Sequence, residues 1–158
     1  MNLLRRCLPL LLLPLLFLAG CSNPRPSGII ITLIDIRPTS ATVLESSATL
    51  TLRLTSENIS PLGFSGSSHK LYLNGDYVGR AVSNEPFGIP PLTSVTRDVT
   101  VHLENLSLVR QLIAMRNTQT ASYRLENVLH QTIYEDKTEM KSRSEGSIDL
   151  RSFANIAP

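Results

Sequence analysis

The chain has 158 residues, a formal net charge of +2 and two cysteines, Cys7 and Cys21. The surplus charge comes from Arg5 and Arg6, so the 138 residues after Gly20 carry 13 basic and 13 acidic side chains. This neutral balance argues against a nucleic-acid-binding or polybasic membrane-surface protein, and the single remaining cysteine excludes a disulfide framework or a multi-cysteine zinc site.

Residues 1–20 have the pattern of an export signal. Arg5 and Arg6 precede a leucine-rich run at 8–18. That run is too short to cross a bilayer as a helix, which needs roughly 20 apolar residues. A positive segment, a short apolar run and small residues are typical of a secretory signal peptide.

Leu18-Ala19-Gly20-Cys21 resembles the lipobox of bacterial lipoprotein precursors in all four positions. The resemblance implies cleavage before Cys21 and attachment of a diacylglyceryl group to its sulfur, with acylation of the new amino group. Ser22, where aspartate would signal inner-membrane retention, implies the outer membrane facing the periplasm if the bacterium is Gram-negative. The alternative is an ordinary signal peptide followed by a chance cysteine. Cys21 is the only site residue that the sequence predicts.

A short polar tether separates Cys21 from the domain. Residues 21–28 are rich in Pro, Gly and Ser, which is typical of a linker. The segment 22–28 spans at most roughly 23 Å, so the domain at 29–150 is expected to lie close to its membrane. Residues 151–158 are expected to form a loose tail.

The first half of the domain has strand periodicity. Residues 29–36 predict a buried strand that ends at Arg37-Pro38, and residues 48–55 alternate between apolar and polar side chains. Residues 57–66 predict a loop. Asn74-Gly75 between apolar runs predicts a tight hairpin, because both turn positions need a positive φ.

The second half repeats the pattern after a proline-rich connection at 86–91. Residues 95–103 alternate, with Arg97 interrupting the apolar face. Residues 106–116 predict the one helix, with Asn105 as its N-cap. Further strands are expected at 121–133, 138–142 and 146–150. About seven short strands and one short α-helix predict a mainly β protein, a two-sheet antiparallel β-sandwich of immunoglobulin or fibronectin III type.

No arrangement of residues predicts catalysis, a cofactor or a metal site. The histidines His69, His102 and His130 share no ligand spacing, so all three are interpreted as solvated surface residues. Ser65-Gly66-Ser67-Ser68-His69 lacks the strand-to-helix elbow of a serine nucleophile and is interpreted as a polar loop. Glu135 and Asp136 are adjacent at a turn and would point apart if extended.

The pattern as a whole resembles the late embryogenesis abundant group 2 family, also called the water-stress and hypersensitive-response (WHy) domain, over about residues 29–150. The sharpest match is Leu73-Asn74-Gly75 with Val78-Gly79 after it. Two positions depart from the family pattern: its Asn-Pro-Asn loop is here Asn58-Ile59-Ser60-Pro61, and its glycine after the Tyr-x-Leu strand is here Asn127. The resemblance implies a folded, non-enzymatic module associated with stress and with protecting other proteins from aggregation.

The leading functional hypothesis is therefore a monomeric, lipid-anchored envelope protein that protects proteins or membrane during water stress. The alternatives are an envelope assembly or adaptor lipoprotein that docks partners on its sandwich, and an enzyme. The enzyme would need an apolar pocket with converging titratable groups. The sequence identifies no client and no partner beyond the membrane reached by the lipid.

Overall fold

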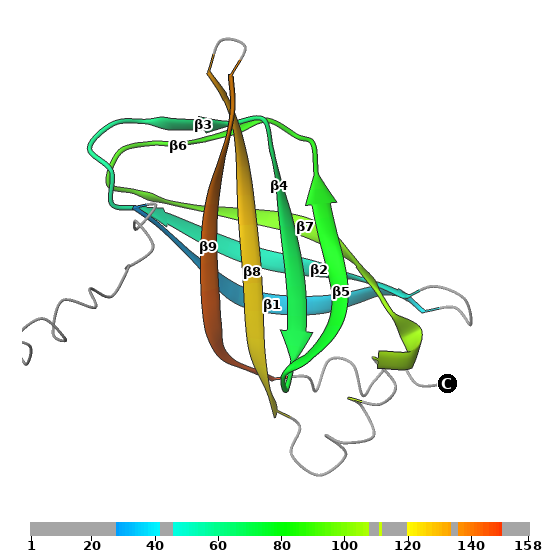
Figure 1. The fold of residues 1–158 in the computed structure, drawn as a ribbon. Coiled ribbons are helices and arrows are strands. Elements are labelled where there is room, and N and C mark those ends of the chain that lie inside the picture. The colour runs from blue at the N-terminus through cyan, green and yellow to red at the C-terminus, as the bar shows by residue number, and fades with distance from the viewer. Residues whose placement is uncertain (1–27, 42–45, 108–110, 112–119, 134–135, 150–158) are drawn as a thin grey trace, which may run out of the picture.

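Strands make up nearly all of the regular structure. The computed structural model describes residues 28–41, 46–107, 111, 120–133 and 136–149, and Figure 1 shows their arrangement. The strands within those residues are β1 (Ile29–Ala41), β2 (Ser46–Ser56), β3 (Leu62–Phe64), β4 (Gly66–Leu73), β5 (Asp76–Ser83), β6 (Phe87–Ile89), β7 (Ser94–Leu103), β8 (Thr120–Ile133) and β9 (Asp136–Asp149). The prediction of a mainly β protein is confirmed.

Seven strands form one antiparallel sheet in the order β1-β2-β7-β5-β4-β8-β9. The sheet curls into a half-barrel, so that β9, β8, β4 and β5 cross in front of β7, β2 and β1 (Figure 1). The edge strands β1 and β9 approach within 8 Å between Cα atoms. The expected sandwich of immunoglobulin or fibronectin III type is not confirmed, because the two layers belong to one continuous sheet.

The alternation in β2 and β7 sets the core of the half-barrel. Ala48, Leu50, Leu52 and Leu54 are buried as predicted. Leu50 pairs with Val99 and so places two apolar side chains side by side on the inner face. The opposite face is exposed to solvent, and there the Thr51 hydroxyl donates a hydrogen bond to the Asp98 carboxylate at 2.6 Å. This division between an apolar and a polar face fixes the register, because a slip of one residue would expose every leucine.

The first strand, β1, is longer than the sequence predicts, and its outer face is more exposed to solvent. It continues through Arg37 and Pro38 to Ala41, with a register shift on either side of this pair. A proline is tolerated because β1 is an edge strand, where one side of the backbone needs no ladder partner. Ile30 and Ile34 lie on the outer face and are exposed, so the prediction of burial holds only for the inner-face side chains Ile29, Ile31, Leu33 and Ile36.

The predicted hairpin between β4 and β5 is confirmed. Asn74 and Gly75 form its turn with φ values of 48° and 94°, the left-handed region that a two-residue hairpin requires. The Asn74 side chain also accepts a hydrogen bond from the Ser122 amide at 3.1 Å. The turn is therefore fastened to β8 as well as closed on itself.

Two short strands that the sequence did not predict cover one end of the half-barrel. β3 lies inside the predicted loop at 57–66, and β6 lies inside the proline-rich connection. Phe64 and Ile89 are buried, and the rings of Phe64 and Phe87 lie 5.1 Å apart. The Arg97 guanidinium stacks 4.3 Å from the Phe87 ring, which explains how a charged residue interrupts the apolar face of β7.

The C-terminal elements differ from the prediction in their extent. The expected strands at 138–142 and 146–150 are parts of one strand, β9, which pairs with β8 along its whole length. Residues 105–107 and Gln111 are helical, and the helix begins at Asn105 rather than being capped by it. The rest of the predicted helix and the tail 151–158 lie outside the described residues.

The sheet turns from its front layer to its back layer at Gly79. β5 and β7 pair over three positions only, Gly79–Leu103, Arg80–His102 and Ala81–Val101. A Cβ atom on Gly79 would lie 2.3 Å from the His102 carbonyl oxygen and 3.1 Å from the Leu103 Cα. Glycine is required here because backbone atoms of the neighbouring strand occupy the space of any side chain.

We predict that Gly79→Ala destabilises the protein by about 1–3 kcal/mol, since β7 must move away to admit the methyl group. Gly63→Ala in β3 is the matched control, because nothing lies within 4 Å of a Cβ at that position. Urea unfolding followed by circular dichroism measures both free energies of unfolding. An equal loss in the two variants would contradict the role of the close approach.

Candidate functional site

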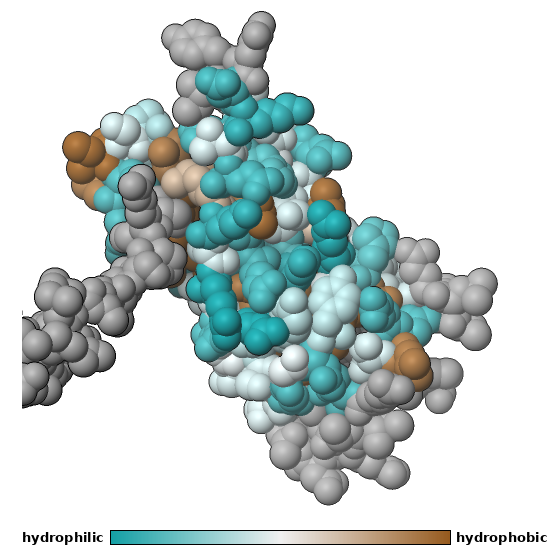
Figure 2. All heavy atoms as spheres, viewed as in Figure 1, coloured by the Kyte–Doolittle hydropathy of each residue, from teal (hydrophilic) through white to brown (hydrophobic). Residues whose placement is uncertain are grey.

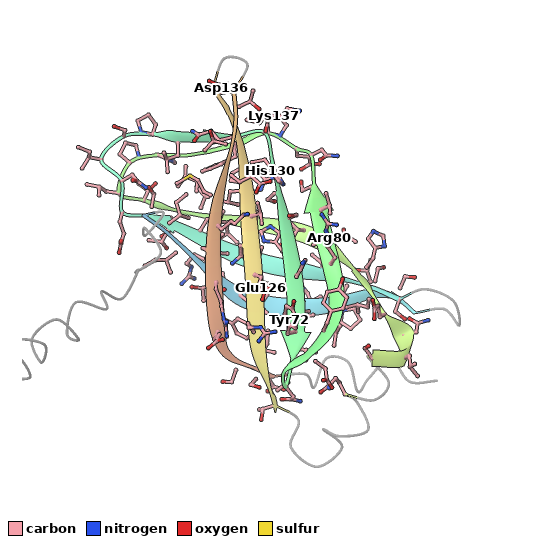
Figure 3. All side chains as sticks on the ribbon, in the orientation of Figure 1. Tyr72, Arg80, Glu126, His130, Asp136 and Lys137 are labelled. Atoms are coloured by element: carbon pink, nitrogen blue, oxygen red, sulfur yellow. The ribbon has the colours of Figure 1, made fainter. Side chains whose placement is uncertain are left out.

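The outer face of β4, β8 and β9 carries two hollows. One, of about 510 Å³, is lined by Ser68, Lys70, Glu126, Asn127, Val128, Lys141, Ser142 and Arg143. The other, of about 410 Å³, lies toward the start of β9 and includes His130 and Lys137 in its lining. Figure 2 shows this face as mainly hydrophilic, and Figure 3 shows Glu126, His130 and Lys137 along it.

The charges on this face are mixed and partly paired. Lys141 lies 3.3 Å from Glu139, and Arg143 is paired with Glu145. Lys70, by contrast, makes no ion pair within the described part of the chain. All these side chains are exposed, so each pair contributes little to stability. The face can offer hydrogen bonds and charge to a partner, but it does not enclose one.

Tyr72 anchors a small cluster at the other end of the same face. Its hydroxyl donates to Glu126 at 3.2 Å, and the Arg124 guanidinium lies 3.9 Å from its ring. The Tyr77 ring meets it edge-on at 5.6 Å between centroids. Burial, aided by the Glu104 charge, raises the pKa of the Tyr77 phenol. The cluster therefore holds aromatic surface and paired charges in place at neutral pH.

A buried polar group lies on the inner side of the same strands. His69 is 2% exposed, with Nδ1 2.8 Å from Asn127 Oδ1 and Nε2 3.0 Å from the Ser67 hydroxyl. The Asn127 amide donates to the Ser142 hydroxyl at 3.3 Å. These distances fit a neutral imidazole that donates from Nδ1 and accepts from the serine. The interpretation of His69 as a surface residue and of 65–69 as a loop is wrong, because Gly66 to His69 belong to β4.

The order serine, histidine, asparagine resembles a nucleophile, a base and an orienting group, but the location excludes that use here. Ser67, His69 and Asn127 are each at least 98% buried. A substrate therefore cannot reach the serine oxygen. Burial lowers the pKa of the His69 imidazole, against the opposing effect of the Asn127 hydrogen bond. The arrangement is a satisfied polar group within an apolar core.

The other sequence-selected residues are scattered. His102 is exposed on β7, and His130 Nδ1 lies 3.8 Å from Glu139 on the outer face. Asp136 begins β9, whereas Glu135 and the predicted lipid attachment residue Cys21 lie outside the described residues. Within the part of the chain that the structure describes, no group of three or more His, Cys, Asp or Glu residues could hold a metal ion. No helix there is long and apolar enough to span a membrane.

The start of the domain is fixed by hydrogen bonds from the loop after β2. The Gly28 carbonyl accepts the Glu57 amide at 2.8 Å and the Asn58 side-chain amide at 3.0 Å. The Asn58 carbonyl in turn accepts the Leu92 amide at 3.0 Å. Three segments far apart in the sequence thus meet where β1 begins. Sequence reasoning missed this cluster because no local signal joins its members.

Comparison with known proteins agrees with the fold. The family model for the late embryogenesis abundant protein family matches residues 51–134, which is more than half of the chain. None of the curated proteins matches the chain.

A solution structure of a protein from Arabidopsis thaliana is similar with a TM-score of 0.59 and 12% identity, over 83% of this chain and 89% of that one. A crystal structure of a protein from Archaeoglobus fulgidus is similar with a TM-score of 0.47 and 17% identity, over 75% and 97%. At these identities the likeness concerns the fold alone, and it rests on the Arabidopsis structure.

We predict that the stability of the protein falls as the pH drops below about 6.5, the ordinary value of the histidine pKa. The unfolded chain then takes up a proton that buried His69 takes up only at lower pH, at a cost of up to about 1.4 kcal/mol per pH unit. His69→Gln should flatten the decline in the free energy of unfolding between pH 7 and pH 5. His102→Gln, at an exposed position, should leave it unchanged, and equal slopes in both variants would contradict the prediction.

We predict that Asn127→Ala lowers the free energy of unfolding by about 1–3 kcal/mol, because the His69 Nδ1–H is left buried without an acceptor. Asn84→Ala is the control, since Asn84 is exposed and its side chain makes no hydrogen bond within the described residues. Chemical denaturation at pH 7 measures the difference. If Asn127→Ala lowers the free energy of unfolding no more than the control does, the prediction that the His69 network stabilises the protein is wrong.

Proposed function

Because the chain belongs to the late embryogenesis abundant group 2 family, we propose that it is a non-enzymatic envelope protein that protects other proteins or the membrane when water is withdrawn. We further propose that a lipid on Cys21 holds it at the membrane. The observation that carries the protective role is the family match across the centre of the domain. The observation behind the proposed lipid anchor is the lipobox at residues 18–21.

The anchor is supported by the order of the N-terminal segments. A short apolar run leads into Leu18-Ala19-Gly20-Cys21, and a polar tether then reaches Gly28. Two or three acyl chains give stable membrane attachment where one gives only marginal binding. The tether spans at most roughly 23 Å, which keeps the domain near the headgroups.

The protective role has a physical basis in the outer face of β4, β8 and β9. Drying removes water from polar groups, and each group left without a hydrogen bond is costly. Lys70 on β4 and Lys137 on β9 make no ion pair within the described part of the chain, so their donors are available to neighbouring carboxylates, phosphates and carbonyls. Many weak contacts of this kind would keep dried proteins or headgroups apart without a dedicated binding site.

The second candidate is an adaptor that docks one envelope protein. It is favoured by β9, a long edge strand, because a partner strand could pair with the part of its edge that does not lie against β1. Its charged side chains, which include Glu139, Lys141 and Arg143, instead resemble those with which proteins discourage such pairing. Crosslinking in membranes separates the candidates: many weak clients support protection, whereas one stoichiometric partner supports the adaptor.

We predict that Cys21→Ser moves the protein from the membrane fraction to the soluble envelope fraction and lowers survival of drying to the level of a deletion strain. Loss of the acyl chains removes the attachment. Cys7→Ser is the matched control and should change neither readout, since that residue belongs to the removed signal. An unchanged distribution of the Cys21 variant would overturn the anchor. Unchanged drying survival of the deletion strain, with no anti-aggregation effect of the purified protein, would overturn the protective role.

A further inference from the structure

Two neighbouring loops at the end of the half-barrel where β1 begins each carry an exposed apolar side chain. Ile59 is 85% exposed in the loop between β2 and β3, and Leu92 is 66% exposed in the loop between β6 and β7. The hydrogen bond from the Leu92 amide to the Asn58 carbonyl brings their backbones side by side. Figure 2 shows hydrophobic spheres at this end, where the ribbon of β3 and β6 joins β2 and β7.

The two loops are held firmly. The Ser56 amide donates to the Thr93 carbonyl at 2.8 Å, and the Thr93 hydroxyl donates to the Pro90 carbonyl at 3.0 Å. Pro90 and Pro91 further restrict the backbone of the second loop. The backbones of the two loops that carry Ile59 and Leu92 are thus held in place by these hydrogen bonds and by the two prolines.

Leu92 is displayed at a conformational cost. Its φ is 51°, a left-handed conformation that L-residues other than glycine, asparagine and aspartate rarely adopt. Burial of its side chain does not offset this cost, because two thirds of the residue is exposed. A glycine would satisfy the backbone without strain. A leucine here therefore points to a use for its side chain outside the domain.

The position of this end relative to the tether indicates what covers it. The Gly28 carbonyl accepts a hydrogen bond from the side-chain amide of Asn58, and Asn58 directly precedes Ile59. The tether from Cys21 to Gly28 is short, so a lipid on Cys21 holds this end within roughly 23 Å of the bilayer whatever the orientation of the domain. Apolar side chains next to a bilayer are stabilised by entering its interfacial layer.

We propose that Ile59 and Leu92 insert into the lipid interface as a second membrane contact, which orients the domain with the β3–β6 end toward the bilayer. This inference rests on the proposed lipid anchor at Cys21. The exposed carboxylate of Glu57 at the base of the first loop limits the depth of insertion, since its charge stays at the level of the headgroups.

The mature chain suits a site-specific label. Cleavage removes Cys7 and acylation blocks Cys21, so an introduced cysteine is the only free thiol. We would purify the full lipidated protein as Ile59→Cys, Leu92→Cys and Val82→Cys, each carrying an environment-sensitive fluorophore. Val82 is the matched control, an apolar side chain that is 52% exposed on β5. Each protein is reconstituted into phosphatidylcholine–phosphatidylglycerol vesicles with or without a quencher on the acyl chains.

We expect a blue shift and a loss of emission with acyl-chain quencher for the labels at 59 and 92, and neither change for the label at 82. Flotation of the vesicles reports the lipid anchor separately. If the protein floats but the labels at 59 and 92 remain unquenched, the inference is overturned while the anchor stands. If the protein does not float, the anchor and this inference are both overturned. Emission that changes with protein density and not with the quencher would indicate a second copy on the patch and would also overturn the inference.

Leu92→Gly provides an independent test. Relief of the positive φ should raise the midpoint of thermal unfolding, while loss of the apolar side chain should reduce quenching of the label at position 59. This opposite movement distinguishes a membrane-contacting leucine from a structural one. A lower midpoint with unchanged quenching would overturn the proposal.

Discussion

The narrow pairing of β5 with β7 is the constraint on which the rest of the structure depends. Only three residue pairs join the front and back layers of the sheet, and they include Gly79, whose missing side chain lets the two backbones approach. Because the sheet turns at this point, apolar side chains from both layers face one another and form a single core. The ribbon of β3 and β6 then covers one end, and β9 comes back to lie against β1.

The polar group of Ser67, His69 and Asn127 shows how that core tolerates hydrogen-bonding side chains. His69 and Asn127 are paired residues on β4 and β8, so their bond exists in one register only. A slip of β8 by one residue would remove Asn127 from the core and leave the imidazole unsatisfied. The asparagine that replaces the family glycine thus acts together with a histidine on the neighbouring strand.

The elements that the sequence predicts are those whose signal is local. The alternation of β2 and β7 and the Asn74-Gly75 turn identify themselves within a few residues, and Cys21 is predicted from its own motif. β3 and β6 lack such a signal because they are three residues long, and their burial depends on each other. The start of β4 has the composition of a loop, because its serines and His69 are polar and the partner that satisfies His69 lies 58 residues away. The curl of the sheet and the meeting of Gly28, Asn58 and Leu92 likewise arise from pairings between distant segments.

The two surfaces for which we propose functions lie on different parts of the half-barrel. The loops that carry Ile59 and Leu92 are held at the end where β1 begins. The charged outer face of β4, β8 and β9 instead follows the lengths of those strands (Figure 1). A domain held to lipid by that end would keep the charged face directed along the membrane surface, in reach of neighbouring proteins and headgroups. A domain held by the tether alone would rotate, and its donors would meet any one neighbour less often. An ordered contact at the tethered end would therefore increase the local concentration of hydrogen-bonding groups where drying first brings envelope components together.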